Sequence, residues 1–380
     1  MAAQPVATDS YLPALPAIRA ELGNAAVSLT VFVLAMGIGQ LPSGPLSDRI
    51  GRRPVLLGGL ALYALAAFGA ALASNVEMLV VARALQGVAM GATLVCARAA
   101  VRDVYTAIEG AHALARGMTG VGAVALSSPI VGAVLVEFVG WRSVFVLMGA
   151  YALALLALCT GRFGETRVLA APGSVARRGV REVFGNASFR AWGSVAVATY
   201  AGIFAFLLLS PAVYISYLGL SPTQYAWIPA GGALVYIVST TLCRRLLLRF
   251  GALRTEQFGA CLSLLGALIQ AAGCLWAPRS LWPLLLGHAA FTFGHGIHQP
   301  CGQSGAVAEL PHAAGRAVAW HGFSMMLVAF ACGQIAASFV DDAATWGAWP
   351  MVAPIVLAAV ALTVIAWGWL PRVERRPEPQ

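Results

Sequence analysis

Long apolar runs, separated by short polar segments, dominate this chain and limit what it can fold into. A segment of about 20 apolar residues is long enough to cross a bilayer as a helix. Lipid offers no hydrogen-bond partners, so each spanning backbone must satisfy its own polar groups as a helix. The sequence therefore predicts an all-α integral membrane protein. Twelve spans are expected: 1–19, 27–47, 54–73, 77–98, 112–138, 142–161, 192–217, 224–248, 256–276, 281–303, 316–340 and 346–370.

Composition supports the same class. Of the 380 residues, 59% are hydrophobic and only 10% are charged, whereas a soluble domain carries about 25% charged residues. All 24 basic residues are arginine, and 20 of them fall in alternate polar segments or the C-terminal tail. Under the positive-inside rule this places those segments and both termini in the cytoplasm. The net charge of +9 thus reflects membrane topology, and nucleic acid is not an expected partner.

The longest polar stretch, 162–191, divides the spans into two groups of six. We expect an N-terminal six-helix bundle over 1–161, a cytoplasmic linker over 162–191, a C-terminal bundle over 192–370 and a tail over 371–380. The seven cysteines lie in apolar stretches or at their ends and include no Cys-x-x-Cys pair. They are interpreted as small buried residues, and no metal site is expected.

The charged turn, residues 44–53, joins the second and third spans. It holds one aspartate and three arginines, with Gly44 and Gly51 placed where close backbone approach is expected. Asp48 is expected to pair with an arginine or to lie near the positive end of a helix, with Arg98 and Arg102 as candidate partners. Arg52 and Arg53 are adequately explained as solvated arginines that fix topology.

Four sequence motifs resemble the major facilitator superfamily, over nearly the whole chain. The subfamily that they resemble is the Bcr/CflA drug-efflux group. The motifs are Gly44-x-x-x-Asp48-Arg49-x-Gly51-Arg52-Arg53, Arg83-x-x-Gln86-Gly87, the opening 8–16 and the stretch 98–105.

The resemblance implies two pseudo-symmetric six-helix bundles around a central cavity, with alternating access. It implies that the charged turn, with Arg98 and Arg102, acts as a conformational latch that holds the cytoplasmic side closed. It also implies an antiporter-like fifth helix, here only partly matched by Gly122, Pro129 and Gly132. The second half repeats the charged turn in degenerate form around Gly251, without the aspartate.

Asp9 is the one carboxylate that the sequence places inside the membrane. Hydrocarbon penalises the charged form of a carboxyl group, so Asp9 is suited to loading and releasing a proton or to pairing with a cationic substrate. The alternative is a solvated aspartate at the end of a shortened first helix. Arg83 is also intramembrane; the resemblance gives it a part in proton transfer with Gln86, and a structural tie to backbone carbonyls is the alternative.

Three histidines lie at spacings of seven and three on the tenth span: His288, His295 and His298. They are interpreted mainly as polar packing, and a part in handling protons or substrate is the alternative. With Tyr11, His295 and His298 are candidates for the cavity lining.

The predicted function is proton-coupled export of small amphipathic, antibiotic-like compounds across a bacterial inner membrane. The expected partners are substrate, protons and lipid, the expected state is a monomer, and the proton gradient replaces any cofactor. The absence of a Walker loop argues against ATP as the energy source, and no enzyme activity is expected. Two alternatives stay open. One is a metabolite exporter or importer of the same fold. The other is a non-transporting remnant, because the first helix looks shortened and its true start is expected further upstream.

Overall fold

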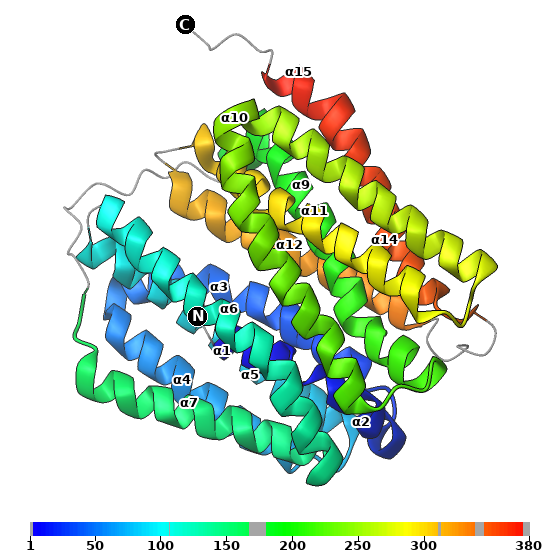
Figure 1. Ribbon diagram of the computed structural model, residues 1–380. Helices are drawn as coiled ribbons and strands as arrows, with labels where there is room; N and C mark the ends of the chain where they lie inside the picture. The colour runs from blue at the N-terminus through cyan, green and yellow to red at the C-terminus, as the bar shows by residue number, and fades with distance from the viewer. Residues whose placement is uncertain (1–2, 106, 167–179, 311–312, 339–345, 375–380) are drawn as a thin grey trace, which may run out of the picture. The chain divides into compact units, whose positions relative to one another are not determined.

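The computed structural model describes residues 3–105, 107–166, 180–310, 313–338 and 346–374, and these residues are almost entirely helical. Figure 1 shows the helices in chain order. The chain divides into two compact units, Met1–Ala176 with Leu220–Ala230, and Arg177–Gly219 with Gly231–Gln380. The all-α membrane class is confirmed.

The first unit opens with a broken segment and continues with five long helices. Pro13 and Pro16 lack an amide hydrogen and are best tolerated in the first turn of a helix. Each lies in the first turn of a short element, η1 and α2, so the segment predicted as the first span is divided into short pieces. The elements are α1 (Ala3–Thr8), the 3-10 helix η1 (Leu12–Ala14), α2 (Leu15–Leu22), α3 (Ala26–Ile50), α4 (Arg52–Ala71), α5 (Val76–Val104), α6 (Ala107–Phe138) and α7 (Arg142–Arg162).

Helix α5 packs against both α3 and α4, and α4 also packs against α7. The α3–α5 contact is close because of glycine: a Cβ on Gly87 or Gly91 would collide with backbone atoms of α3. Small residues at membrane helix interfaces allow backbones to approach in this way. This packing holds Arg83, on α5, in the interior of the unit.

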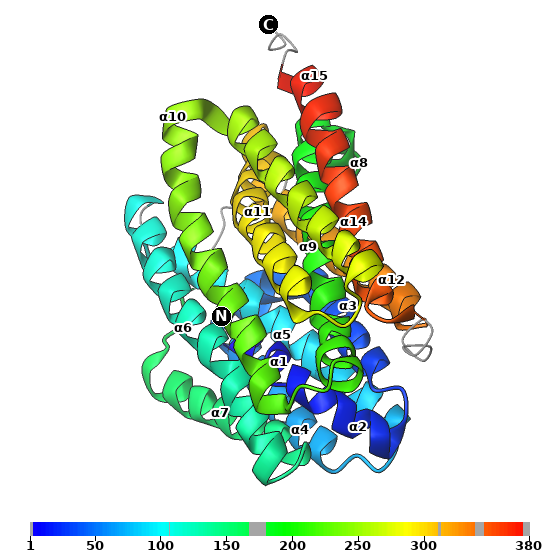
Figure 2. The same ribbon diagram turned by 45° about the vertical axis from the view of Figure 1, so that its right-hand side comes forward.

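The second unit is centred on α9, which packs against α11, α12 and α14 (Figure 2). Figure 2 also shows α10 turning back on itself. The turn lies at Gly251, whose φ of 76° is not helical. The elements are α8 (Val180–Gly185), α9 (Ala187–Pro211), the π-helix η2 (Ala212–Tyr217), α10 (Pro222–Trp276), α11 (Leu281–Ala308), α12 (Ala314–Ala337), α14 (Trp349–Val364), the π-helix η5 (Ile365–Trp369) and α15 (Leu370–Glu374).

Among the described residues, nine helices are long and apolar enough to cross a membrane, against the twelve spans predicted. Three differences account for this. The first predicted span is broken into short pieces. The predicted spans 224–248 and 256–276 form the single element α10. Helix α11 is long but is not among the nine, and it contains the three histidines and two glutamines.

Candidate functional site

Arg83 is fully buried and surrounded by aromatic rings. The centre of its guanidinium lies 4.1 Å from the ring centroid of Phe32, 4.7 Å from Tyr11 and 6.0 Å from Phe145. A cation over an aromatic face is stabilised by the ring quadrupole. The guanidinium also donates to Gln86 Oε1 at 3.0 Å and to the carbonyl of Ala7 at 3.2 Å. The predicted pairing of Arg83 with Gln86 is present, and so is a tie to a backbone carbonyl.

Asp9 lies two residues after the carbonyl that Arg83 binds, at the break between α1 and η1. Its carboxylate is half-buried and accepts a hydrogen bond from the Thr8 hydroxyl at 2.7 Å. Among the described residues, no ion pair joins Asp9 to Arg83. Arg83 therefore binds the backbone next to Asp9. It does not pair with the Asp9 carboxylate.

Tyr11 is one of the three aromatic residues that surround Arg83. Its hydroxyl lies 2.6 Å from Ser28 Oγ, and its ring lies 5.4 Å from Phe145. Tyr11 is completely buried, and its place in the cavity lining stays a prediction.

The antiporter-like residues of α6 lie beside the same segment. A Cβ on Gly132 would collide with the backbone of Ser10, so this glycine permits the helix to approach the residue next to Asp9. Pro129 is buried within α6, and Gly122 is half-buried. The structure thus brings Gly132 near Asp9, although the motif is incomplete.

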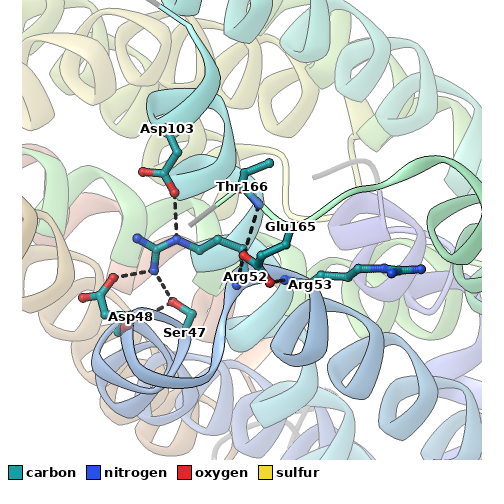
Figure 3. A network of polar contacts seen from close by, with 8 residues as sticks. Ser47, Asp48, Arg52, Arg53, Asp103, Glu165 and Thr166 are labelled. Atoms are coloured by element: carbon teal, nitrogen blue, oxygen red, sulfur yellow. Dashed lines mark hydrogen bonds and ion pairs between the residues drawn. The ribbon is translucent and has the colours of Figure 1, made fainter. Parts of the chain in front are cut away.

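The charged turn forms a network centred on Arg52 (Figure 3). The Arg52 side chain is only 6% exposed; it lies 2.5 Å from Asp48 and 2.9 Å from Asp103, and donates to Ser47 Oγ at 2.6 Å. The interpretation of Arg52 as a solvated arginine is therefore wrong. Two carboxylates and a hydroxyl compensate a charge that the packing of α4 and α5 removes from water.

The glycines and the other arginines of the turn differ in their surroundings. Gly51 has φ 107°, and a Cβ there would collide with the carboxylate of Glu165. A Cβ on Gly44 meets open space, so the close approach expected at Gly44 is absent from this structure. Arg53 donates to the Thr160 carbonyl at 2.9 Å, and Arg49 is exposed.

The partner found for Asp48 is Arg52, four residues away, and not Arg98, whose side chain is exposed. The side chain of Arg102 lies outside the described residues. The sequence analysis also missed Glu165, whose carboxylate accepts from the backbone amides of Arg52 and Arg53 at 2.8 and 3.2 Å. It thereby caps the start of α4, where free amide hydrogens attract negative charge.

In the second unit, His298 pairs with a carboxylate that sequence reasoning placed at a span end. Glu256 Oε1 lies 2.6 Å from His298 Nδ1, and both side chains are completely buried. His295 Nδ1 lies 2.9 Å from the Thr199 hydroxyl. His288 stacks on Phe206 and lies 3.2 Å from the Thr292 hydroxyl. Asp9 is therefore not the only carboxylate inside the helices, and the signal for Glu256 was its position five residues after the glycine turn.

The described residues form a helical membrane protein with a few buried charged side chains, which are Arg52, Arg83 and Glu256. No group of three metal-ligating side chains occurs among them. The model of the Major Facilitator Superfamily matches residues 2–323 of this chain.

The chain belongs to the Major Facilitator Superfamily.

Curated relatives of this superfamily protein cover most of its length. A chloramphenicol resistance protein of Pseudomonas aeruginosa is 29% identical over 372 residues, which are 96% of this chain and 87% of that protein. Multidrug resistance protein D of Escherichia coli (strain K12) is 30% identical over 328 residues, 82% of this chain and 80% of that protein. The resemblance expected from the four motifs is confirmed.

Solved structures share the superfamily fold. A D-xylose–proton symporter has a TM-score of 0.77 and 16% identity, covering 99% of this chain and 97% of that chain. A bacterial homolog of the human lysosomal transporter Spinster has a TM-score of 0.75 and 16% identity, and the match covers 100% of this chain and 98% of that chain. At this identity the likeness shows the fold alone. The family match over residues 2–323 and the membrane-length helices of the described residues make the protein a multi-pass membrane transporter of the major facilitator type.

Proposed function

We propose that this transporter exports small amphipathic, antibiotic-like compounds across the bacterial inner membrane in exchange for protons. The main support is its similarity, over most of its length, to resistance proteins for chloramphenicol and multiple drugs. The distribution of arginine supports an orientation with both termini in the cytoplasm. The charged turn is proposed as the latch that closes the cytoplasmic side, with Arg52 rather than Arg98 as the partner of Asp48.

Asp9 is the proposed proton carrier of the first unit. Its backbone is fixed by the hydrogen bond from Arg83 to Ala7 and by the close contact of Gly132 with Ser10. Its carboxylate, held mainly by the neighbouring Thr8 hydroxyl, is left able to exchange a proton. A fixed backbone with an exchangeable side chain is the arrangement that a coupling residue requires.

Asp9→Asn should abolish proton-coupled export while leaving the protein folded, because the amide keeps the size of the side chain and loses the exchangeable proton. Transport is measured in inverted vesicles with an imposed proton gradient, using chloramphenicol and a panel of amphipathic drugs. Glu77→Gln is the matched control, since Glu77 is an exposed carboxylate in the first turn of α5.

Export by Asp9→Asn at the wild-type rate, with the proton gradient still dissipated, would overturn the role of Asp9. The direction in which protons move relative to the compound distinguishes antiport from symport. Symport would favour the alternative of a metabolite importer with the same fold. No movement of any tested compound by the wild type would favour the non-transporting alternative.

A further inference from the structure

The second unit contains a buried acid–base pair to which the proposed function assigns no role. Glu256 lies on α10 just after the turn at Gly251, and His298 lies on α11. Their side chains meet at 2.6 Å, between Glu256 Oε1 and His298 Nδ1, and neither is exposed. Ionisable side chains inside membrane helices are costly, and they mark ion and proton pathways more often than packing.

The second ring nitrogen of His298 has a partner that suits both protonation states. His298 Nε2 lies 3.0 Å from the hydroxyl of Ser263. A serine hydroxyl can donate to a neutral imidazole nitrogen or accept from an imidazolium N–H. Nδ1 can donate to Glu256 in either state. The hydrogen bonds of His298 are therefore satisfied whether the pair holds its proton or has lost it.

Glu256 favours binding of that proton. Its second oxygen, Oε2, is buried and has no hydrogen-bond partner among the described residues, and no arginine in the described part of the chain forms an ion pair with Glu256. With neutral His298 the pair carries one uncompensated negative charge in an apolar setting, which is expensive. One added proton makes the pair neutral overall.

The surroundings supply few competing charges. The neighbouring packing includes Ile297, Cys243 and Cys301, which belong to the apolar core of this unit. Titratable groups near the pair, among the described residues, include the thiols of Cys243 and Cys301, whose sulfurs lie 3.9 Å apart, and the imidazole of His295 one turn away on α11. None of these is a fixed cation, so a proton is the counter-charge at hand.

The order Ser263–His298–Glu256 also has the connectivity of a hydrolase triad. A nucleophile must be reachable by its substrate, and Ser263 is completely buried. The arrangement therefore fits an exchangeable proton and does not fit acyl transfer.

We propose that Glu256 and His298 together bind one exchangeable proton, forming a second protonation site in the C-terminal unit, separate from Asp9. Its ligand is the proton itself. Its use in the transport cycle rests on the proposed proton-coupled export, whereas proton binding by the pair does not.

The test uses purified full-length protein in detergent, without substrate. Nitrogen NMR of labelled histidine follows the imidazoles from about pH 5 to about pH 8, the window in which histidine ordinarily changes charge. The signal of His298 is assigned by its loss in His298→Gln. If that variant does not fold, the five other histidines of the six in the chain are replaced one at a time instead.

In the wild type we expect the His298 signal to change along the pH series, because the pair takes up a proton. In Glu256→Gln it should stay neutral throughout, because the amide removes the negative charge that holds the proton. Direct proton counting should show a loss of about one exchangeable proton per molecule in Glu256→Gln, since Glu256 and His298 share that proton in this proposal. His295→Gln is the matched control and should keep that proton, because His295 bonds Thr199 and not Glu256.

A His298 signal that does not change over the window in folded wild-type protein overturns the proposal and leaves a structural tie between α10 and α11. So does a Glu256→Gln variant that releases as many protons as the wild type. These outcomes do not depend on export. Failure of the wild type to export any drug counts against the proposed function alone, while coupling through Asp9 without titration of His298 counts against this site alone.

Discussion

Among the turns that place a glycine at positive φ, two correspond in sequence position between the two units: Gly51, with φ 107°, and Gly251, with φ 76°. The residues around them differ. Asp48 lies three positions before Gly51, and Leu248 lies three positions before Gly251. The residue after the glycine is Arg52 in the first turn and Ala252 in the second. The first turn has the Arg52 network, whereas in the second Leu248 is 91% exposed and Arg249 lies 5.2 Å from the ring of Phe250.

The comparison shows that backbone shape and charge chemistry are separable. Only glycine adopts these positive φ values readily, and both turns keep it. The carboxylate of the second unit lies not in the turn but further along, at Glu256, where it meets a histidine inside the helices. In the first turn, ion pairs of Arg52 connect α3, α4 and α5. In the second turn, the helices are held together by apolar packing.

The largest effect is expected at Arg52. Arg52→Met should lower the free energy of unfolding by about 3 kcal/mol, because it leaves the nearly buried Asp103 carboxylate without its partner. Arg249→Met, in the other turn, should cost under about 1 kcal/mol, the value of an exposed cation–π contact. Both are measured by equilibrium unfolding in detergent.

A second variant checks the cause of that loss. Adding Asp103→Leu to Arg52→Met should recover part of the stability, because no unpaired carboxylate then remains. Equal losses for Arg52→Met and Arg249→Met would mean that the two turns are energetically alike, and the comparison would fail.

An intermediate effect is expected at the glycines. Gly251→Ala should cost about 1–3 kcal/mol, because its φ of 76° and ψ of 175° lie in a region that almost only glycine adopts. Gly51→Ala should cost more, because its Cβ must also displace the Glu165 carboxylate that caps α4. In a Glu165→Ala background the two glycine variants should become similar. A difference that persists there would show that Glu165 is not its source.

The smallest effect is expected at an exposed pair at the other end of the first unit. Glu21 lies 2.7 Å from Arg142 and accepts from Trp141 Nε1 at 2.7 Å. The hydrogen bond from Arg142, then the one from Trp141, lowers the pKa of Glu21 below its ordinary value of 4.5. The stabilisation is therefore present above that value and is lost as the pH falls through the lowered pKa.

Glu21→Gln should accordingly unfold at a lower temperature than the wild type at neutral pH, by a small and salt-sensitive margin. The margin should shrink as the pH falls below 4.5. The measurement is the melting temperature of Glu21→Gln and of the wild type over a range of pH. Its small margin is then compared with the large loss expected for Arg52→Met. A margin independent of pH would assign the effect of Glu21 to packing and not to its charge.

Sequence alone determined the class and the family of this protein. Apolar runs of membrane length permit only helices in lipid, and the motifs around Asp48 and Arg83 are local patterns that can be read without a structure. The pairing of Arg83 with Gln86 was predictable for the same reason, because residues three apart share a helix face. The need for glycine at residue 51 was also predictable.

Only the tertiary structure decided which charges meet. Arg52 contacts Asp103 and Glu165, which are 51 and 113 residues away in the chain, and His298 contacts Glu256, 42 residues away. Sequence separation gives no measure of these distances, because they depend on how the helices rotate and pack. Burial follows from the same packing, which is why an arginine expected in solvent lies in the interior and a glutamate expected at a helix end meets a histidine inside the protein.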